Sequence, residues 1–135
     1  MRTLQELIDR HSIIWFSIGS DKDLCTQFMS ELAELGMLWV NGRPVTPEDN
    51  CSYFMGFGPS RTIGHISWQI WRVSWLNEES DPDHRERFYS NGQIPLRVDY
   101  GKYRRGEEDY LVRENVVKIV GGFTYPVGGR ILFVD

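Results

Sequence analysis

The stretch of residues 13–45 constrains the fold of this chain more than any other part. It begins with residues 13–18, which are almost wholly apolar and rich in β-branched and aromatic side chains. Such a run predicts an interior β-strand, covered on both faces or on one face with a partner on the other. No nucleophile, metal-ligand or phosphate-loop motif lies on or beside the stretch, so it indicates a fold class and no chemistry.

The second part of the stretch has the pattern of an amphipathic helix. Ser20 is a suitable N-cap, and the two aspartates that follow place negative charge in the first turn, where the helix dipole favours it. Gly36 is a typical residue just beyond a helix end. We therefore expect a helix over residues 21–35, and its buried face should consist of Leu24, Phe28, Leu32 and Leu35.

A short strand over residues 37–40 should follow and end in a type I′ turn at Asn41-Gly42, because both positions of this dipeptide tolerate a positive φ. Apolar runs predict four further strands, over residues 51–57, 62–75, 96–100 and 112–120. The second of these strands should contain a register slip or bulge near Gln69. A short helix from Thr3, a charged segment over 77–95 and a terminal hairpin with arms 123–125 and 130–134 complete the pattern.

These elements predict one α+β domain over residues 1–135. The domain should contain a mainly antiparallel sheet of about five to seven strands, with the helix over 21–35 packed on one face.

The charge balance and the cysteines restrict the class of protein. The formal net charge is -4, from 19 acidic and 15 basic residues, which disfavours direct nucleic-acid binding. No apolar run is long enough to span a membrane and the N-terminus has no signal-peptide pattern, so we expect a cytoplasmic protein. Cys25 and Cys51 have no paired spacing, which argues against a disulfide framework or a zinc site and favours two core or half-buried thiols.

Candidate catalytic residues are lacking. His11, His65 and His84 are far apart in sequence and have no ligand partner at metal-binding spacing. We therefore predict no metal, no cofactor and no catalytic residue, although His65 lies on a strand that a cleft could adjoin. The protein is more consistent with a binding protein than with an enzyme.

The most distinctive polar cluster lies between Arg97 and Tyr110. Tyrosine and arginine dominate interface hot spots because they combine a large contact area with polar bonding. The alternative interpretation of this cluster is a solvated turn in which opposite charges pair with one another. We predict a partner-facing surface made of Tyr100, Tyr103, Arg104, Arg105, Glu107, Glu108, Asp109 and Tyr110.

Three of the five tryptophans share one short region. Spread over two strand faces, at least one of them should reach the surface and belong to a ligand groove or a protein interface, although a core built from large residues is the stronger alternative. The candidate ligand-stacking residues are Trp68, Trp71 and Trp75.

The pattern Trp15-Phe-x-Ile, followed by an acidic helix start and by Leu35-Gly-x-x-Trp39-x-Asn-Gly42, resembles small accessory α+β proteins of phages and prophages of Gram-positive bacteria. The resemblance covers residues 12–45. It implies a non-enzymatic protein that binds and inhibits a bacterial host protein, with a nucleic-acid-binding effector as partner and anti-CRISPR activity as the most specific version. The resemblance assigns no role to any individual residue. It also leaves open whether the chain forms a homo-oligomer.

A small-molecule or nucleotide binder, or a hydrolase with an unrecognised site, is the alternative. In that case Tyr53, Trp68 and Trp71 would stack a base, and Arg61 or Arg72 would hold phosphate.

Overall fold

The helix expected over residues 21–35 is present in the structure, a computed structural model, as α2 (Lys22–Glu34). The structure describes residues 2–68, 70–71, 95–112, 115–120 and 123–127. Asp21, rather than Ser20, is the N-cap, and its carboxylate accepts hydrogen bonds from the backbone N–H groups of Asp23 and Leu24 at 2.9 and 3.1 Å. Gly36, at φ 73°, ends the helix as predicted.

The remaining N-terminal elements also follow the sequence pattern. A short helix, α1 (Leu4–Arg10), precedes the strand β1 (Ile14–Ser17). Leu4, Leu7 and Ile8 form the buried side of α1, which confirms the amphipathic spacing.

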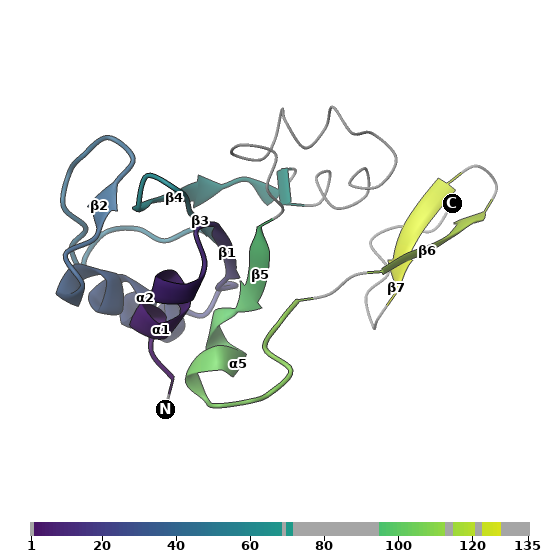
Figure 1. The fold of residues 1–135 in the computed structure, drawn as a ribbon, viewed down its shortest axis with the longest axis horizontal. Coiled ribbons are helices and arrows are strands. Elements are labelled where there is room, and N and C mark those ends of the chain that lie inside the picture. The colour runs from purple at the N-terminus through teal and green to yellow at the C-terminus, as the bar shows by residue number, and fades with distance from the viewer. Residues whose placement is uncertain (1, 69, 72–94, 113–114, 121–122, 128–135) are drawn as a thin grey trace.

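Five strands form one open sheet in the order β2-β4-β3-β1-β5 (Figure 1). Their bounds are β2 Leu38–Trp39, β3 Phe54–Phe57, β4 Thr62–Ile66 and β5 Leu96–Asp99, besides β1. The α+β class is confirmed, but the sheet is mixed rather than mainly antiparallel. β3 runs antiparallel to β1 and β4, whereas β5 is parallel to β1 and β2 is parallel to β4. Parallel neighbours need crossover connections, which strand patterns in a sequence do not display.

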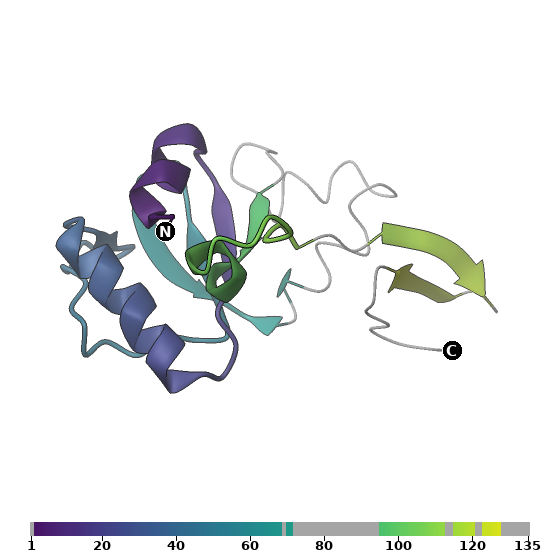
Figure 2. The same cartoon turned by 90° about the horizontal axis from the view of Figure 1, so that it is seen from below.

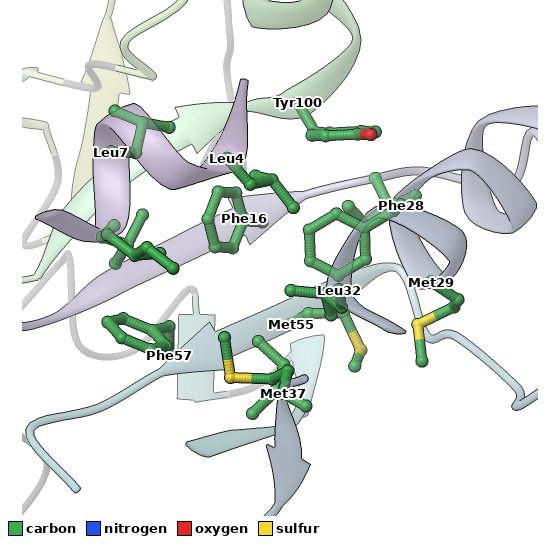
Figure 3. Packing of buried hydrophobic residues seen from close by; sticks show 14 of the residues in the cluster. Leu4, Leu7, Phe16, Phe28, Met29, Leu32, Met37, Met55, Phe57 and Tyr100 are labelled. Carbon is green, nitrogen blue, oxygen red and sulfur yellow. The ribbon is translucent and has the colours of Figure 1, made fainter. Parts of the chain in front are cut away.

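Helices α1 and α2 cover one face of the sheet (Figure 2). Every second strand residue points to this face, and these side chains pack against the apolar stripes of the two helices. The largest fully buried members include Phe16 from β1, Phe28 from α2 and Tyr100, which follows β5 (Figure 3). The rings of Phe16 and Phe28 meet edge to face at 5.1 Å, and those of Phe28 and Tyr100 at 4.9 Å.

A smaller cluster forms on the opposite face of the sheet. Trp15 and Phe54 alternate with the residues of the main core along their strands, and both contact Trp71. The prediction of a strand over residues 62–75 is wrong at residues 67, 68, 70 and 71, and residues 72–75 lie outside the described residues. The backbone N–H of Trp71 donates to the carbonyl of Ser67 at 3.1 Å, so the chain turns helically here and lays Trp71 over the sheet.

The hairpin turn at Asn41-Gly42 differs from the predicted type I′. Only Gly42 has a positive φ, of 87°, and its N–H donates to the carbonyl of Trp39 at 2.8 Å. The loop is therefore a β-turn over residues 39–42 whose last residue is left-handed, one residue longer than predicted. The turn between β3 and β4 has the same arrangement, and there the left-handed residue is Arg61, at φ 62°.

The chain after residue 50 departs further from prediction. Residues 51–57 contribute a strand only from Phe54 onward, and β5 leads into a five-residue helix, α5 (Tyr100–Arg104). β6 (Asn115–Val120) pairs with β7 (Phe123–Val127), which contains the first arm of the predicted terminal hairpin. The second arm of that hairpin, residues 130–134, is not among the described residues. The segments 77–94 and 128–135 lie outside the described residues.

Candidate binding surface

The predicted partner surface at residues 100–110 is in large part an internal contact. Tyr100 is fully buried, and Tyr103 is 2% exposed. The Tyr100 hydroxyl donates to Oε1 of Glu31 at 2.8 Å, and the Tyr103 hydroxyl donates to the backbone oxygen of Thr3 at 2.8 Å. Burial, followed by the nearby Glu6 carboxylate, raises the pKa of Tyr103 to about 12.

Arginines complete this contact with the N-terminal segment. Nη1 of Arg104 donates to the Arg2 carbonyl at 3.0 Å and lies 3.4 Å from Oε2 of Glu31. The Arg2 guanidinium lies over the rings of Tyr103 and Tyr110, at 5.7 and 4.8 Å from their centroids. The assignment of Tyr100 and Tyr103 to an exposed partner surface is therefore wrong, whereas that of Arg104, whose side chain is 18% exposed, stays a prediction. The segment has too few consecutive apolar residues to predict a buried element from its sequence. Tyr100 and Tyr103 are nevertheless buried, because they lie three residues apart on one side of a short helix.

The other members of the cluster form local ion pairs. Lys102 Nζ lies 3.0 Å from Asp109 Oδ2, and Arg105 Nε lies 2.6 Å from Glu107 Oε2. These are the contacts of a solvated turn. Partner binding by Arg105, Glu107, Glu108, Asp109 and Tyr110 stays a prediction.

The three candidate ligand-stacking tryptophans differ in where the structure places them. Trp68 is 53% exposed and keeps the role of a candidate. Trp71 is buried and stacks on Phe54, with ring centroids 4.3 Å apart and planes 14° apart, so its assignment as a ligand platform is wrong. The strand-to-helix change after Ile66 is the physical reason, because it directs Trp71 inward. Trp75 lies outside the described residues.

An open hollow of about 560 Å³ lies where β2 and its hairpin meet β4. Its residues come from the turn, from the following loop and from β4: they are Trp39, Val40, Asn41, Arg43, Glu48, Asp49, Asn50, Gly64 and His65. We call this site the Trp39 hollow. Its size is within the range of small-molecule sites, and its walls mix aromatic, amide and charged groups.

Asp49 organises the wall of the Trp39 hollow. Its Oδ2 accepts the indole N–H of Trp39 at 2.8 Å and the backbone N–H of Thr46 at 2.9 Å, while Arg43 Nη1 lies 3.2 Å from Oδ1. The bond from the Thr46 backbone, then that from Trp39, holds the pKa of this carboxyl well below its usual range. Asp49 is thus a fixed anion that shapes the loop and is not poised for proton transfer.

The neighbouring histidine and serine do not form a nucleophilic pair. The His65 ring stacks on Trp39 at 5.0 Å, and its Nδ1 lies 3.0 Å from Oγ of Ser52. Ser52 Oγ donates its proton to the Phe54 carbonyl at 2.6 Å, so the hydroxyl is an acceptor toward His65. A serine nucleophile needs the opposite polarity, with the histidine nitrogen accepting that proton.

A second hollow, of about 280 Å³, lies on the sheet face opposite the two helices. Its floor is made by Gly56 of β3 and Gly64 of β4, which stand directly opposite each other in the ladder. Trp15 and Ile66 line it on the side of Gly56, and Val40 lies above Gly64. We call these five residues the glycine groove. Because a strand glycine permits close approach of another group, these glycines were a signal that sequence reasoning left unused.

Large apolar side chains lie exposed beside the glycine groove. Val40 is 72% exposed and Leu38 is 41% exposed, and both belong to the β2 hairpin. Val40, Gly64 and His65 line both hollows, so the two form one continuous surface. The phosphate-binding role considered for Arg61 finds no support, since its Nη1 donates to the Ile8 carbonyl at 2.9 Å.

Comparisons with known proteins add no relative: no family model matches the chain, and neither the curated proteins nor the solved structures gave a match. Within the described residues, no three metal-binding side chains gather into a group. No helix in that part of the chain is long and apolar enough to cross a membrane.

Proposed function

We propose that this chain is a non-enzymatic binding protein and that its contact surface is the glycine groove, which includes Val40, together with the neighbouring Leu38. The exposure of Val40 is the observation that supports this most strongly. A valine that is 72% exposed at the edge of a hollow of about 280 Å³ offers a partner an apolar contact beside a concave surface.

The finer proposal rests on the resemblance of residues 12–45 to phage accessory proteins. The partner is then a bacterial host protein, and binding inhibits it, with a nucleic-acid-binding effector of a CRISPR system as the most specific case. Acidic side chains would compete for a basic groove on such a target, because they present the same sign of charge as phosphate.

The test begins with capture from a bacterial host lysate on the wild-type chain and on Val40→Glu. A partner identified on the wild type is then purified, and its Kd is measured for both chains. We expect Val40→Glu to weaken binding by about thirtyfold, equivalent to about 2 kcal/mol at a hot spot. Gln27→Glu, which introduces the same charge at an exposed position of α2 on the other face of the sheet, is the matched control and should bind as wild type.

A plaque assay with and without the gene tests the finer proposal. Increased phage survival in a host with an active defence supports inhibition of that defence. If a partner binds but phage survival is unchanged, the binding function stands and the anti-defence proposal fails.

The Trp39 hollow supports a second candidate function, the binding of a small molecule. A volume of about 560 Å³, with Arg43, Asn50 and the stacked His65 on its walls, suits a planar polar ligand. A thermal-shift screen separates the candidates, because a ligand at about a hundred times its Kd stabilises a protein by roughly 2.7 kcal/mol. His65→Ala should abolish that shift, whereas Val40→Glu should weaken partner binding by about thirtyfold.

A further inference from the structure

The wall of the Trp39 hollow carries polar groups that the fold does not use. Glu48 and Asn50 both line the hollow, and both side chains are exposed. Within the described part of the chain, neither side chain has a hydrogen-bond or ion-pair partner. Asp49, which lies between them in sequence, already accepts the N–H groups of Trp39 and Thr46. A ligand in the hollow would therefore meet the carboxylate of Glu48 and not that of Asp49.

His65 adds a further acceptor to the same wall. Its Nδ1 lies 3.0 Å from Oγ of Ser52, which donates its own proton to the Phe54 carbonyl. Nδ1 must therefore carry the proton of this contact, and Nε2 of the neutral ring presents a lone pair. No described residue bonds to Nε2. Because Ser52 fixes the tautomer, His65 acts toward a ligand as an acceptor.

The charge of the hollow is negative. Two carboxylates, those of Glu48 and Asp49, line it, and Arg43 is the only arginine or lysine among the lining residues. Arg43 Nη1 lies 3.2 Å from Oδ1 of Asp49, so this pair is neutral and the charge of Glu48 is left uncompensated. Val40, which is 72% exposed, adds an apolar surface at the border of the hollow.

We propose that the Trp39 hollow receives an arginine side chain of the protein that docks on the glycine groove, an inference that rests on the proposed function. A guanidinium carries a permanent positive charge and a planar fork of N–H donors, and it has no acceptor. Glu48 pairs with its charge, and Nε2 of His65 accepts a further N–H. The methylene stem of the arginine packs against Val40.

Arginine fits this wall better than other polar groups do. A lysine ammonium is a compact point charge, whereas the guanidinium fork presents donors in several directions and can meet acceptors on two residues. An anionic group would face the uncompensated Glu48 carboxylate. Val40, Gly64 and His65 line both hollows, so one partner segment can contact the glycine groove and place a side chain in the Trp39 hollow. Exposed arginines are also typical of proteins that bind nucleic acid, the class proposed for the partner.

The test titrates the full-length protein with N-acetylarginine amide and follows the binding by NMR. We expect shifts of the Trp39 indole N–H and of the Gly64 and His65 signals. N-acetylcitrulline amide, a neutral probe of nearly the same shape, is the matched ligand, and it should bind about tenfold more weakly because it lacks the charge. N-acetyllysine amide should also bind more weakly than the arginine probe.

Two variants test the two acceptors. Glu48→Gln removes the charge, and His65→Phe keeps a ring against Trp39 but removes Nε2. Each should weaken binding of the arginine probe by about tenfold. Glu34→Gln, which changes an exposed glutamate of α2 outside the hollow, is the control and should bind the probe as wild type.

Equal binding of the arginine and citrulline probes, or shifts away from the hollow, would overturn the inference. The comparison of probes on the wild-type chain needs no variant, so it decides the question even if His65→Phe folds poorly. If the arginine probe fails to bind while a partner still depends on Val40, the arginine site fails and the proposed function stands. If the probe binds in the hollow but no partner is found, the proposed function fails and the guanidinium site stands.

Discussion

The Tyr100 hydroxyl donates a hydrogen bond of 2.8 Å to Oε1 of Glu31 and so joins α5 to α2. Oε2 of the same carboxylate accepts the backbone N–H of Leu4 at 2.6 Å, at the start of α1. One side chain therefore connects three helices that are remote in sequence. This contact explains why a cluster with the composition of an interface is part of the fold.

Tyr100→Phe should lower the free energy of unfolding by about 1 kcal/mol, since it removes one hydrogen bond and leaves the ring against Phe28 in place. Urea unfolding monitored by circular dichroism measures the change. Tyr53→Phe is the control, because the Tyr53 ring is 55% exposed, and it should change stability by less than about 0.5 kcal/mol. Equal effects at the two positions would contradict the role of the Glu31 contact.

Tyr103→Ala should destabilise the protein by about 3 kcal/mol, because it removes a ring that is 2% exposed together with its bond to Thr3. Arg105→Ala, in the same segment but with a side chain that is 63% exposed, should be nearly neutral. Both values come from denaturant titration. If Tyr103→Ala left stability unchanged and weakened partner binding, the original interpretation of this cluster as an interface would be restored.

The raised pKa of Tyr103 predicts that the protein loses stability at alkaline pH. Its pKa is about 12 in the folded protein and 10 in its ordinary state. Because the folded-state pKa is raised, the stabilising contribution is fully present below pH 10 and is lost as the pH rises through 12. Unfolding titrations over this window should show a smaller loss of stability with pH for Tyr103→Phe than for wild type. Identical slopes would contradict the assignment.

Two equivalent turn positions offer a matched pair of substitutions. Gly42 and Arg61 are both left-handed, at φ 87° and 62°, and nothing lies within 4 Å of where a Gly42 side chain would begin. Gly42→Ala should therefore cost about 1 kcal/mol, from backbone strain alone. Arg61→Ala loses the bond to Ile8 and keeps the strain, whereas Arg61→Gly loses the bond and relieves the strain.

The glycine variant at position 61 should therefore be more stable than the alanine variant by about 1 kcal/mol. Thermal unfolding of the three variants, side by side with wild type, gives the comparison. An alanine variant at position 61 as stable as the glycine variant would show that the turn relaxes without strain.

The N-terminal elements were predictable because local signals agree there. The aspartates at the helix start, the helical spacing and Gly36 all indicate the same helix, and residues 13–18 have no competing pattern. At residues 67–71 the signals conflict. Aromatic and β-branched residues favour a strand, but burial of Trp71 against Phe54 and Trp15 stabilises a helical turn that only the tertiary structure makes available.

The candidate surface was less predictable, since it depends on register. Gly56 and Gly64 become a groove only because the β3–β4 ladder places them opposite each other. Asp49 acquires its role through a contact with Trp39, ten residues away, and the loop that permits this contact has no distinctive motif. Cross-strand and loop contacts of this kind follow from three-dimensional pairing and not from periodicity.

Gly64→Ala tests the glycine groove most directly. A methyl group at this position would lie 3.0 Å from Cγ2 of Val40, whose exposed side chain has room to move aside. The fold should therefore tolerate the change, while the groove loses the space above its floor. We expect the affinity for a captured partner to fall by about tenfold or more, with a melting temperature close to that of wild type.

Gly64→Ala combined with Val40→Ala restores the room that the displaced side chain occupies but removes an apolar contact, so it should bind no better than Gly64→Ala alone. Gln27→Ala, at an exposed position of α2 on the other face of the sheet, is the control, and it should bind as wild type. Wild-type affinity in a folded Gly64→Ala protein would show that the partner binds elsewhere.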